Sequence, residues 1–496
     1  MSFLGLDLGT SGLKGLLIDA RQVVLAEASA PLTTHHPAPG WSEQEPTSWT
    51  HAARAVLDQL KADAPDHLAR LSAIGLSGHM HGATLLDSAD QVLRPCLLWN
   101  DTRAAAEATE MDADPAFRQV TGNIVFPGFT APKVEWVRRH EPELFERIAK
   151  ILLPKDYLRL WLTGEHVSDM SDSAGTAWMD VAKRAWSPQL LAKSHLMMAQ
   201  MPALIEGTQI GGMMRPELLA QFGITGPVSV VGGGGDNAAA AVGTGSVREG
   251  DGFVSLGTSG VLLAARDSFA PQPQTAVHSF CHALPGRWYQ MGVTLAATDC
   301  LNWLSARLNQ TPQELSQALP TKPLGPSDLT FLPYLSGERT PHNDSAIRGA
   351  FVGLDIAHDN TDLTRAVMEG VAFALADCMI ALQSTGARFD QCLAVGGGAR
   401  SGFWVATLAN VLGVPMARPD AGEMGAAQGA ALGAARLALA GTTLADAFAK
   451  PATHKQVDPD PALRAAYADA HQRYRALYPA LRPLAQTAAT PPPPAS

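Results

Sequence analysis

The heptapeptide LDLGTSG at residues 6–12 recurs almost unchanged as VSLGTSG at residues 254–260. In each copy an apolar run leads into the Gly-Thr-Ser stretch and another follows it, which predicts a strand, a tight turn and a return strand. The backbone amides of such a turn can face an anion. One copy alone would be an ordinary glycine hairpin. Recurrence at corresponding places in two halves favours two related half-structures that bind phosphate.

The two copies differ just before the turn, where the first carries Asp7 and the second Ser255. A carboxylate can hold a cation, so we expect the first turn to position a cation and the second to hold phosphate. The GKT, GKS and GxGxxG patterns of Walker and dinucleotide-binding loops are absent from the sequence. The glycine runs therefore do not predict a dinucleotide oxidoreductase.

Composition limits the remaining classes. The 496 residues are 46% hydrophobic and 17% charged, which is typical of a packed globular protein with two domains. The net charge of -10, without a basic run, argues against nucleic acid as a partner. No basic leader or long apolar stretch predicts a signal or a membrane span, and five scattered cysteines without CxxC spacing fit a reducing cytoplasm.

The chain alternates strand-like and helical stretches, which predicts an α/β fold. We expect domains at residues 1–246 and 247–482 and a disordered proline-rich tail at 483–496. Helical patterns cover residues 363–382 and 461–480, and another follows the buried positions Trp49, Ala53, Val56, Leu57 and Leu60.

Asp236 is the best candidate for a general base. It follows a strand-like run and the glycines of GGGGDNAAAA, at the mouth of a predicted helix, where a carboxylate can face a cleft. Phosphoryl transfer needs a carboxylate that accepts the proton of the acceptor hydroxyl and a metal that neutralises the phosphates. The alternative is an Asp that only caps the helix.

Two further motifs suggest ligand contacts. SGHMHGATLL at 77–86 places Met80 and His81 after a strand, where α/β proteins bind ligands, with His79 and His81 on the same side of an extended chain. These histidines either bind a hydroxylated ligand or are structural. LLWNDTR at 97–103 holds a polar set that either binds a polyol or forms a salt bridge, and VGGGARSGFW at 395–404 offers bare backbone on which adenine or ribose could lie.

Taken together, these residues resemble the FGGY carbohydrate kinase family, related to actin, hexokinase and the 70-kDa heat-shock ATPases. GFTAPKVEWVRRH at 128–140 and GLDIAHDNTDLTRAVMEG at 353–370 are similar to its two signatures. Within the family, SGHMHGATLLD, LLPKDYLRLWLTGE, SDMSDSAGT and FLPYLSGERTPHN look most like the bacterial xylulokinase branch, over residues 1 to about 480.

The resemblance implies two actin-like (ribonuclease H-like) ATPase domains around a central cleft. It also implies ATP-dependent phosphorylation of D-xylulose to D-xylulose 5-phosphate by a cytoplasmic homodimer. Carried onto matching positions, Asp236 would be the base, and Met80, His81 and Asn237 would line the sugar. Asp7 and Asp236 would hold Mg2+ through bound water molecules. The nucleotide would contact Thr10, Ser11, Gly257, Thr258, Thr298, Asn302, Gly397, Gly398 and Gly402.

Two departures from this branch stand out. His79 occupies a position where bacterial xylulokinases usually carry Gln, and the loop at 422–433 is longer than in near relatives. Ribulokinase or another polyol kinase is the alternative within the family. Outside it, the alternative is a non-enzymatic actin-like ATP switch, which would need neither HMHG nor Asp236.

Overall fold

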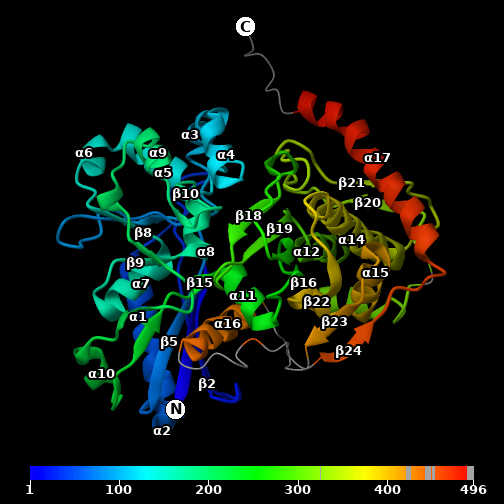
Figure 1. Ribbon diagram of the computed structural model, residues 1–496. Coiled ribbons are helices and arrows are strands. Elements are labelled where there is room, and N and C mark those ends of the chain that lie inside the picture. The colour runs from blue at the N-terminus through cyan, green and yellow to red at the C-terminus, as the bar shows by residue number, and fades with distance from the viewer. Residues whose placement is uncertain (324, 420–425, 442–447, 449–452, 489–496) are drawn as a thin grey trace.

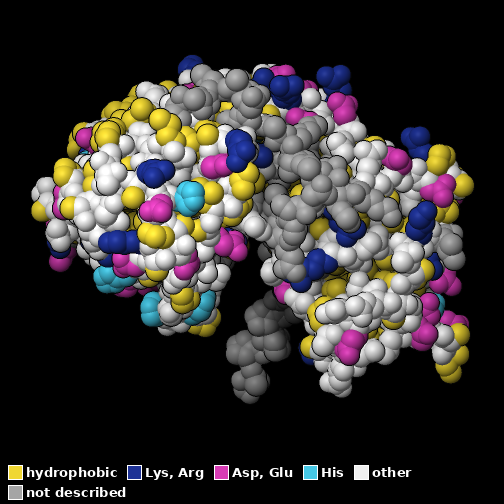
Figure 2. Space-filling model, turned by 90° about the horizontal axis from the view of Figure 1, so that it is seen from below, with side chains coloured by type: hydrophobic (Ala, Val, Ile, Leu, Met, Phe, Trp, Pro, Cys, Tyr) yellow, Lys and Arg dark blue, Asp and Glu magenta, His cyan; other side chains and the backbone are white. Residues whose placement is uncertain are grey.

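The computed structural model describes residues 1–323, 325–419, 426–441, 448 and 453–488. It has two α/β lobes, each built on a central twisted sheet (Figure 1). Figure 2 shows the lobes from below with a notch between them, on a face where acidic and basic side chains are interspersed.

The first sheet has the order β13-β14-β5-β1-β2-β3. Its central strand β1 is buried along its whole length, as its apolar sequence predicts. The strands are β1 Ser2–Leu8, β2 Gly12–Asp19, β3 Val24–Pro31, β5 Leu71–Gly78, β13 Ile210–Met213 and β14 Ser229–Val231, with β15 Gly234–Gly235 on the end of β5.

Helices and short strand pairs surround this sheet. The apolar stripe of α1 is buried against it at all five predicted positions. The helices are α1 Pro46–Asp63, α2 Pro65–Leu68, α3 Ala105–Ala113, α4 Pro115–Thr121, α5 Thr130–His140, α6 Pro142–Phe145, α7 Pro154–Thr163, α8 Met170–Ser173, α9 Pro188–Lys193 and α10 Pro216–Phe222. The short strands pair as β4 Glu43–Gln44 with β7 Cys96–Leu97, β6 Thr84–Leu86 with β8 Lys150–Leu152, β9 Val167–Asp169 with β12 Ala203–Ile205, and β10 Met179–Asp180 with β11 Ala185–Trp186.

The second sheet has the order β18-β19-β17-β16-β22-β23-β24. Its strands are β16 Gly250–Leu256, β17 Gly260–Arg266, β18 His278–Cys281, β19 Trp288–Thr294, β22 Phe389–Val395, β23 Met416–Pro419 and β24 Thr453–Val457, beside a separate pair β20 Thr330–Leu332 and β21 Ala350–Val352. The helices of this part are α12 Thr298–Leu308, α13 Pro312–Gln317, α14 Asn360–Ser384, α15 Gly402–Leu412 and α17 Arg464–Ala488.

The two sheets are copies of one arrangement. The series β3-β2-β1-β5-β14-β13 matches β19-β17-β16-β22-β23-β24, with the same parallel or antiparallel sense at each step. Both predicted hairpins, β1-β2 and β16-β17, occupy the same place in their sheets. The predicted duplicated, actin-like fold is therefore confirmed. The copies differ at one edge, because β13 precedes β14 in the chain whereas β24 follows β23.

Two helices link the lobes. α11 (Asp236–Thr244) ends just before the second sheet begins, and α16 (Ala426–Ala440) returns from the second half to cover the first sheet (Figure 1). A Cβ atom on Gly75 would lie 1.8 Å from the carbonyl oxygen of Ala434, and one on Gly433 would lie 1.7 Å from that of Ala239. Glycine at these positions therefore lets α16 touch both the sheet and α11.

Helix α14 is long and apolar enough to cross a membrane, although the sequence predicted no such segment. Asn360–Ser384 meets that test by length and composition, but 89% of its most apolar window is buried inside the protein. It is the core helix of the second lobe, and it contains the predicted helix at 363–382.

The C-terminal helix α17 is longer than expected. It runs from Arg464 to Ala488, so residues 483–488 of the predicted disordered tail are helical. It packs on the second lobe through Tyr467 and Tyr474, both buried, and through a hydrogen bond from the hydroxyl of Tyr478 to Asp344. Residues 489–496 lie outside the described residues.

Candidate active site

Asp236 lies at the point where the first sheet meets α11. β15 pairs with the last residues of β5, and Asp236 is the first residue of the helix. Gly235, not Asp236, is the N-cap, so the alternative of an N-cap Asp is wrong, although the Asp236 carboxylate does accept from one backbone N–H of the first helical turn. Its Oδ1 accepts hydrogen bonds from the backbone N and the Nδ2 of Asn237, at 2.7 and 2.9 Å.

The environment of Asp236 suits a base. Burial raises the pKa of this carboxyl to about 6, although the two hydrogen bonds from Asn237 lower it. A carboxylate with a pKa near neutrality is ionised at pH 7 and is a stronger proton acceptor than an ordinary Asp.

Asp7 is the penultimate residue of β1 and lies directly beside Ser77 of β5. Its Oδ1 accepts a hydrogen bond of 2.8 Å from the hydroxyl of Ser77, and its side chain is buried. Burial and, to a smaller extent, the negative charge of Asp236 raise the pKa of Asp7 to about 7, against the opposing effects of Ser77 and Lys14. Two carboxylates that raise each other's energy in this way form a site that a divalent cation would stabilise.

The first turn, residues 9–12, joins β1 to β2 and begins two residues after Asp7. It is closed by a 3.0 Å bond from the N–H of Gly9 to the carbonyl of Gly12. The Thr10 hydroxyl accepts a bond of 3.0 Å from the indole of Trp99, and its carbonyl accepts one of 2.6 Å from Gln44. Ser11 is exposed at the tip.

The second turn is fastened to α12. The carbonyl of Gly257 accepts bonds from the backbone N and hydroxyl of Thr298, at 2.9 and 2.8 Å. The carbonyl of Thr258 accepts one of 2.7 Å from the N–H of Ala297. These hydrogen bonds from Ala297 and Thr298 fix the turn against the start of α12 and leave Thr258 exposed.

Met80 and His81 follow β5 on the same side as Asp236. Met80 is buried against Gly235, where an added Cβ would lie 2.8 Å from Met80 Cγ. His81 stacks on Phe129 at 4.7 Å between ring centroids, and its Nδ1 lies 2.7 Å from the carbonyl oxygen of Gly175. That oxygen only accepts, so Nδ1 carries the proton.

Burial, followed by the charge of Lys133, lowers the pKa of His81 to about 3. The ring is therefore neutral at pH 7, and its Nε2 is a hydrogen-bond acceptor. An acceptor of this kind suits a hydroxyl group.

His79 does not share this position. β5 ends at Gly78 and His81 has a φ of +71°, so the expectation of two histidines on one side of an extended chain is wrong. The His79 ring lies edge-on to Trp49 of α1, at 5.9 Å, and is 3% exposed. It is a core residue beneath the site.

Asp101 and Arg103 of the polar set WNDTR form an ion pair. The Asp101 carboxylate is fully buried and accepts from the N–H of Ser42 and the guanidinium of Arg103, which also binds Glu43 at 2.7 Å and lies over the ring of Trp41. Of the two readings left open by the sequence, the structure has the salt bridge.

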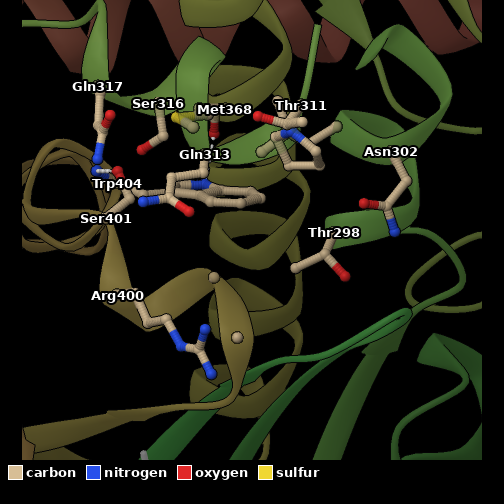
Figure 3. Close-up of a pocket in the computed structure, with 14 residues that line it drawn as sticks. Thr298, Asn302, Thr311, Gln313, Ser316, Gln317, Met368, Arg400, Ser401 and Trp404 are labelled. Atoms are coloured by element: carbon tan, nitrogen blue, oxygen red, sulfur yellow. Dashed lines mark hydrogen bonds between the residues drawn. The ribbon is translucent and has the colours of Figure 1, made fainter. Parts of the chain in front are cut away.

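A cavity of about 860 Å³ opens on the second lobe between α12, α13 and the glycine turn before α15. Thr298 and Asn302 face Arg400 and Ser401 across it (Figure 3). Gly397 and Gly398, in the short 3-10 helix Gly397–Arg400, form part of the wall, and a Cβ on Gly397 would meet nothing within 4 Å. Four predicted nucleotide residues thus line one cavity, whereas Gly402 is not among its lining residues.

Sequence reasoning missed most of the opposite wall. α13 contributes Gln313, Ser316 and Gln317, and the ring of Trp404 closes the end (Figure 3). The α13 residues lie in no glycine motif and reach the cavity only through tertiary packing, whereas Trp404 is the last residue of VGGGARSGFW, of which the prediction used only the glycines. The local signals for the helix are the capping box at its start, Thr311 with Glu314, and Pro312 at the first helical position.

Both halves of the chain match models of one protein family. The N-terminal domain model of the FGGY family of carbohydrate kinases matches residues 2–243, and the C-terminal domain model of that family matches residues 252–440. The chain belongs to the FGGY family of carbohydrate kinases.

Individual FGGY relatives are similar over nearly the full length. A xylulose kinase of Escherichia coli strain K12 is 46% identical over 97% of this chain and 99% of its own. One from Klebsiella pneumoniae is 47% identical over 88% of this chain and 89% of its own. The crystal structure of a "xyloylose kinase" from Brucella ovis has a TM-score of 0.95 at 55% identity, covering 98% of this chain and 100% of that one.

The fold extends further than the sequence similarity. A glycerol kinase of Plasmodium falciparum, solved with ADP, has a TM-score of 0.86 at 18% identity. Membership of the FGGY family makes this chain a sugar kinase that uses ATP.

Proposed function

We propose that this FGGY kinase transfers the γ-phosphoryl group of ATP to D-xylulose, giving D-xylulose 5-phosphate. One observation supports this chemistry: Asp236 follows Gly235, which packs against Met80 at the end of β5, and its negative charge acts on Asp7. The choice of sugar rests on the FGGY relatives, which are xylulose kinases over nearly all of the chain.

Asp236 accepts the proton of the sugar's terminal hydroxyl as that oxygen attacks the γ-phosphorus. The bond from phosphorus to the bridging oxygen breaks and ADP leaves with that electron pair. Both hydrogen bonds from Asn237 fall on Oδ1 of Asp236, which leaves Oδ2 to receive the proton.

Sugar contacts come from the loop after β5. The neutral ring of His81 accepts a hydroxyl hydrogen at Nε2, and Met80 supplies an apolar wall. Asn237, half-buried next to the base, lines the same place. The polar groups for the ketose are thus His81, fixed by the carbonyl of Gly175, and Asn237, fixed by Asp236.

The nucleotide lies between the two turns. Backbone amides and hydroxyls of Thr10, Ser11, Gly257 and Thr258 hold the phosphates, and the adenosine occupies the cavity lined by Thr298, Asn302, Gly397 and Gly398. Gly402 begins α15 next to Ser401, at the edge of that cavity.

Mg2+ fits the paired carboxylates. Asp7 is buried with a raised pKa next to Asp236, and a divalent cation held through water by both would relieve that repulsion. When bound, it neutralises phosphate charge.

We further propose a division between residues 246 and 247, a homodimer and a cytoplasmic location. The first sheet and α11 end before that boundary and β16 begins after it at Gly250. Closure of the two lobes about α11 and α16 would exclude water from the reaction.

The test is release of ADP from MgATP in the presence of a panel of pentuloses, polyols and gluconate. D-xylulose is expected to give the highest kcat/KM, with a phosphorylated product of matching mass. A higher value for ribulose or a polyol would assign the other branch, and ADP release that no sugar stimulates would indicate an ATP switch.

A further inference from the structure

A buried ionic cluster lies directly behind the turn that carries Asp236. Lys155, Asp156 and Arg159 come from α7, Asp169 from β9 and Asp172 from α8, and all five side chains are fully buried. Such groups are costly to bury, since each charge loses its hydration. Nothing in the reaction described above uses them.

One arm of the cluster holds the start of the turn, residues 231–235. The guanidinium of Arg159 donates to the carbonyl of Val231 and, at 2.5 Å, to that of Gly232. Arg159 is held in turn by Asp156, with 3.8 Å between nitrogen and oxygen.

The other arm holds its end. The N–H of Gly235, the residue before Asp236, donates to the hydroxyl of Ser171 at 3.1 Å. That hydroxyl donates to Asp169 at 2.6 Å, and Asp169 pairs with Lys155 at 2.8 Å. The Ser171 oxygen therefore has its proton directed away from Gly235 and its lone pair directed toward it.

Backbone hydrogen bonds and close packing further restrict the conformation of the turn. The N–H groups of Gly232 and Gly233 donate to the carbonyls of Gln209 and Gly207, both at 2.8 Å. Gly233 has a φ of +73°, and a Cβ there would lie 2.0 Å from the carbonyl oxygen of Leu76. The backbone is thus fixed on both sides immediately before the base.

We infer that Ser171 and Arg159 are positioning residues for phosphoryl transfer, which fix the turn at 231–235 so that Asp236 meets the acceptor hydroxyl. The inference rests on the proposed role of Asp236. The cluster would affect catalysis only through Asp236, because proton transfer depends steeply on the placement of the base.

Ser171→Ala tests the inference, with Ser173→Ala as its matched control. Ser173 is equally buried in the same cluster, but its hydroxyl contacts that of Ser168 at 2.8 Å and does not bond the turn. We expect kcat to fall about tenfold in Ser171→Ala while the KM values for ATP and sugar change less than about twofold. Ser173→Ala should stay within about twofold of the wild type.

A double-mutant cycle separates positioning from a structural role. In an Asp236→Asn background there is no base to place, so Ser171→Ala should leave the residual kcat unchanged. Loss of the same factor in both backgrounds would overturn the inference, as would equal losses in Ser171→Ala and Ser173→Ala.

Arg159→Lys provides a second variant for the same cycle, because lysine keeps the charge but lacks the planar guanidinium whose two terminal nitrogens donate to the carbonyls of Val231 and Gly232. If neither Ser171→Ala nor Arg159→Lys folds, the contacts serve folding and the inference is wrong. The cycle is run with whichever sugar the wild type prefers, so failure of D-xylulose as substrate leaves it intact. Wild-type kcat in Asp236→Asn would refute both the base and its positioning.

Discussion

The two sheets share the order of their strands and the parallel or antiparallel pairing of neighbours. Their equivalent central strands, β1 and β16, carry different residues near the turn. In the first sheet, Asp7 lies beside Ser77 one residue before the end of β1, and the chain returns to the carboxyl end of β5 with Gly235 and Asp236. In the second, the equivalent register pairs Ser255 with Val395, followed by the glycine turn that borders the cavity. The comparison teaches that a duplicated scaffold supplies two similar Gly-Thr-Ser turns whose strand ends carry different residues. We propose that these differences divide proton transfer from nucleotide binding.

The largest effect should follow from removing the base of the first half. Asp236→Asn is expected to lower kcat by about two to four powers of ten, the usual contribution of a positioned base, with ATP affinity nearly unchanged. Steady-state kinetics and nucleotide titration measure both. Asp58→Asn, on the exposed side of α1, is the control, and near-normal turnover in Asp236→Asn would remove Asp236 from the mechanism.

Making the first half resemble the second should have the next largest effect. Asp7→Ser is expected to lower kcat about a hundredfold and to raise the Mg2+ concentration needed for half-maximal rate, because one carboxylate near the cation is lost. Ser255→Ala, at the equivalent place in the second sheet, should change kcat less than threefold. Similar Mg2+ dependence in Asp7→Ser and the wild type would argue against the cation site.

Filling the cavity of the second half should affect ATP alone. Gly397→Leu places a side chain in the proposed adenosine space and is expected to raise the KM for ATP about tenfold, while the sugar KM stays constant. Gly226→Leu is a suitable control, because Gly226 also has open space around its Cβ but lies in a loop of the first lobe. An unchanged KM for ATP would place the adenosine elsewhere.

The smallest effect concerns the sugar loop. His81→Ala should raise the sugar KM about fivefold, as expected for one lost hydrogen bond, and leave the KM for ATP unchanged. His79→Gln should leave the sugar KM unchanged, because the His79 ring packs on Trp49. A shifted sugar preference in His79→Gln would contradict the assignment of His79 to the core.

Local sequence signals were enough for the elements that carry the site. The duplicated Gly-Thr-Ser turns, the buried stripe of α1 and the long helix α14 follow from glycine placement and hydrophobic periodicity, which depend only on neighbouring residues. The length of α17 was underestimated, since Pro479 and Pro483 lie inside a helix that extends to Ala488. Packing of Tyr467 and Tyr474 on the second lobe outweighs what proline costs there.

By itself, the sequence determined that this protein has two related halves, each with a Gly-Thr-Ser turn, and it singled out Asp7 and Asp236 as the carboxylates of the proposed site. Short-range patterning suffices for this because a turn and its flanking strands are read within a few residues. Only the tertiary structure decided that His79 is a core residue, that α13 lines the proposed nucleotide cavity and that Ser171 and Arg159 hold the turn before Asp236. Those relations join residues far apart in the chain, and their energies come from packing and buried charge that no local pattern records.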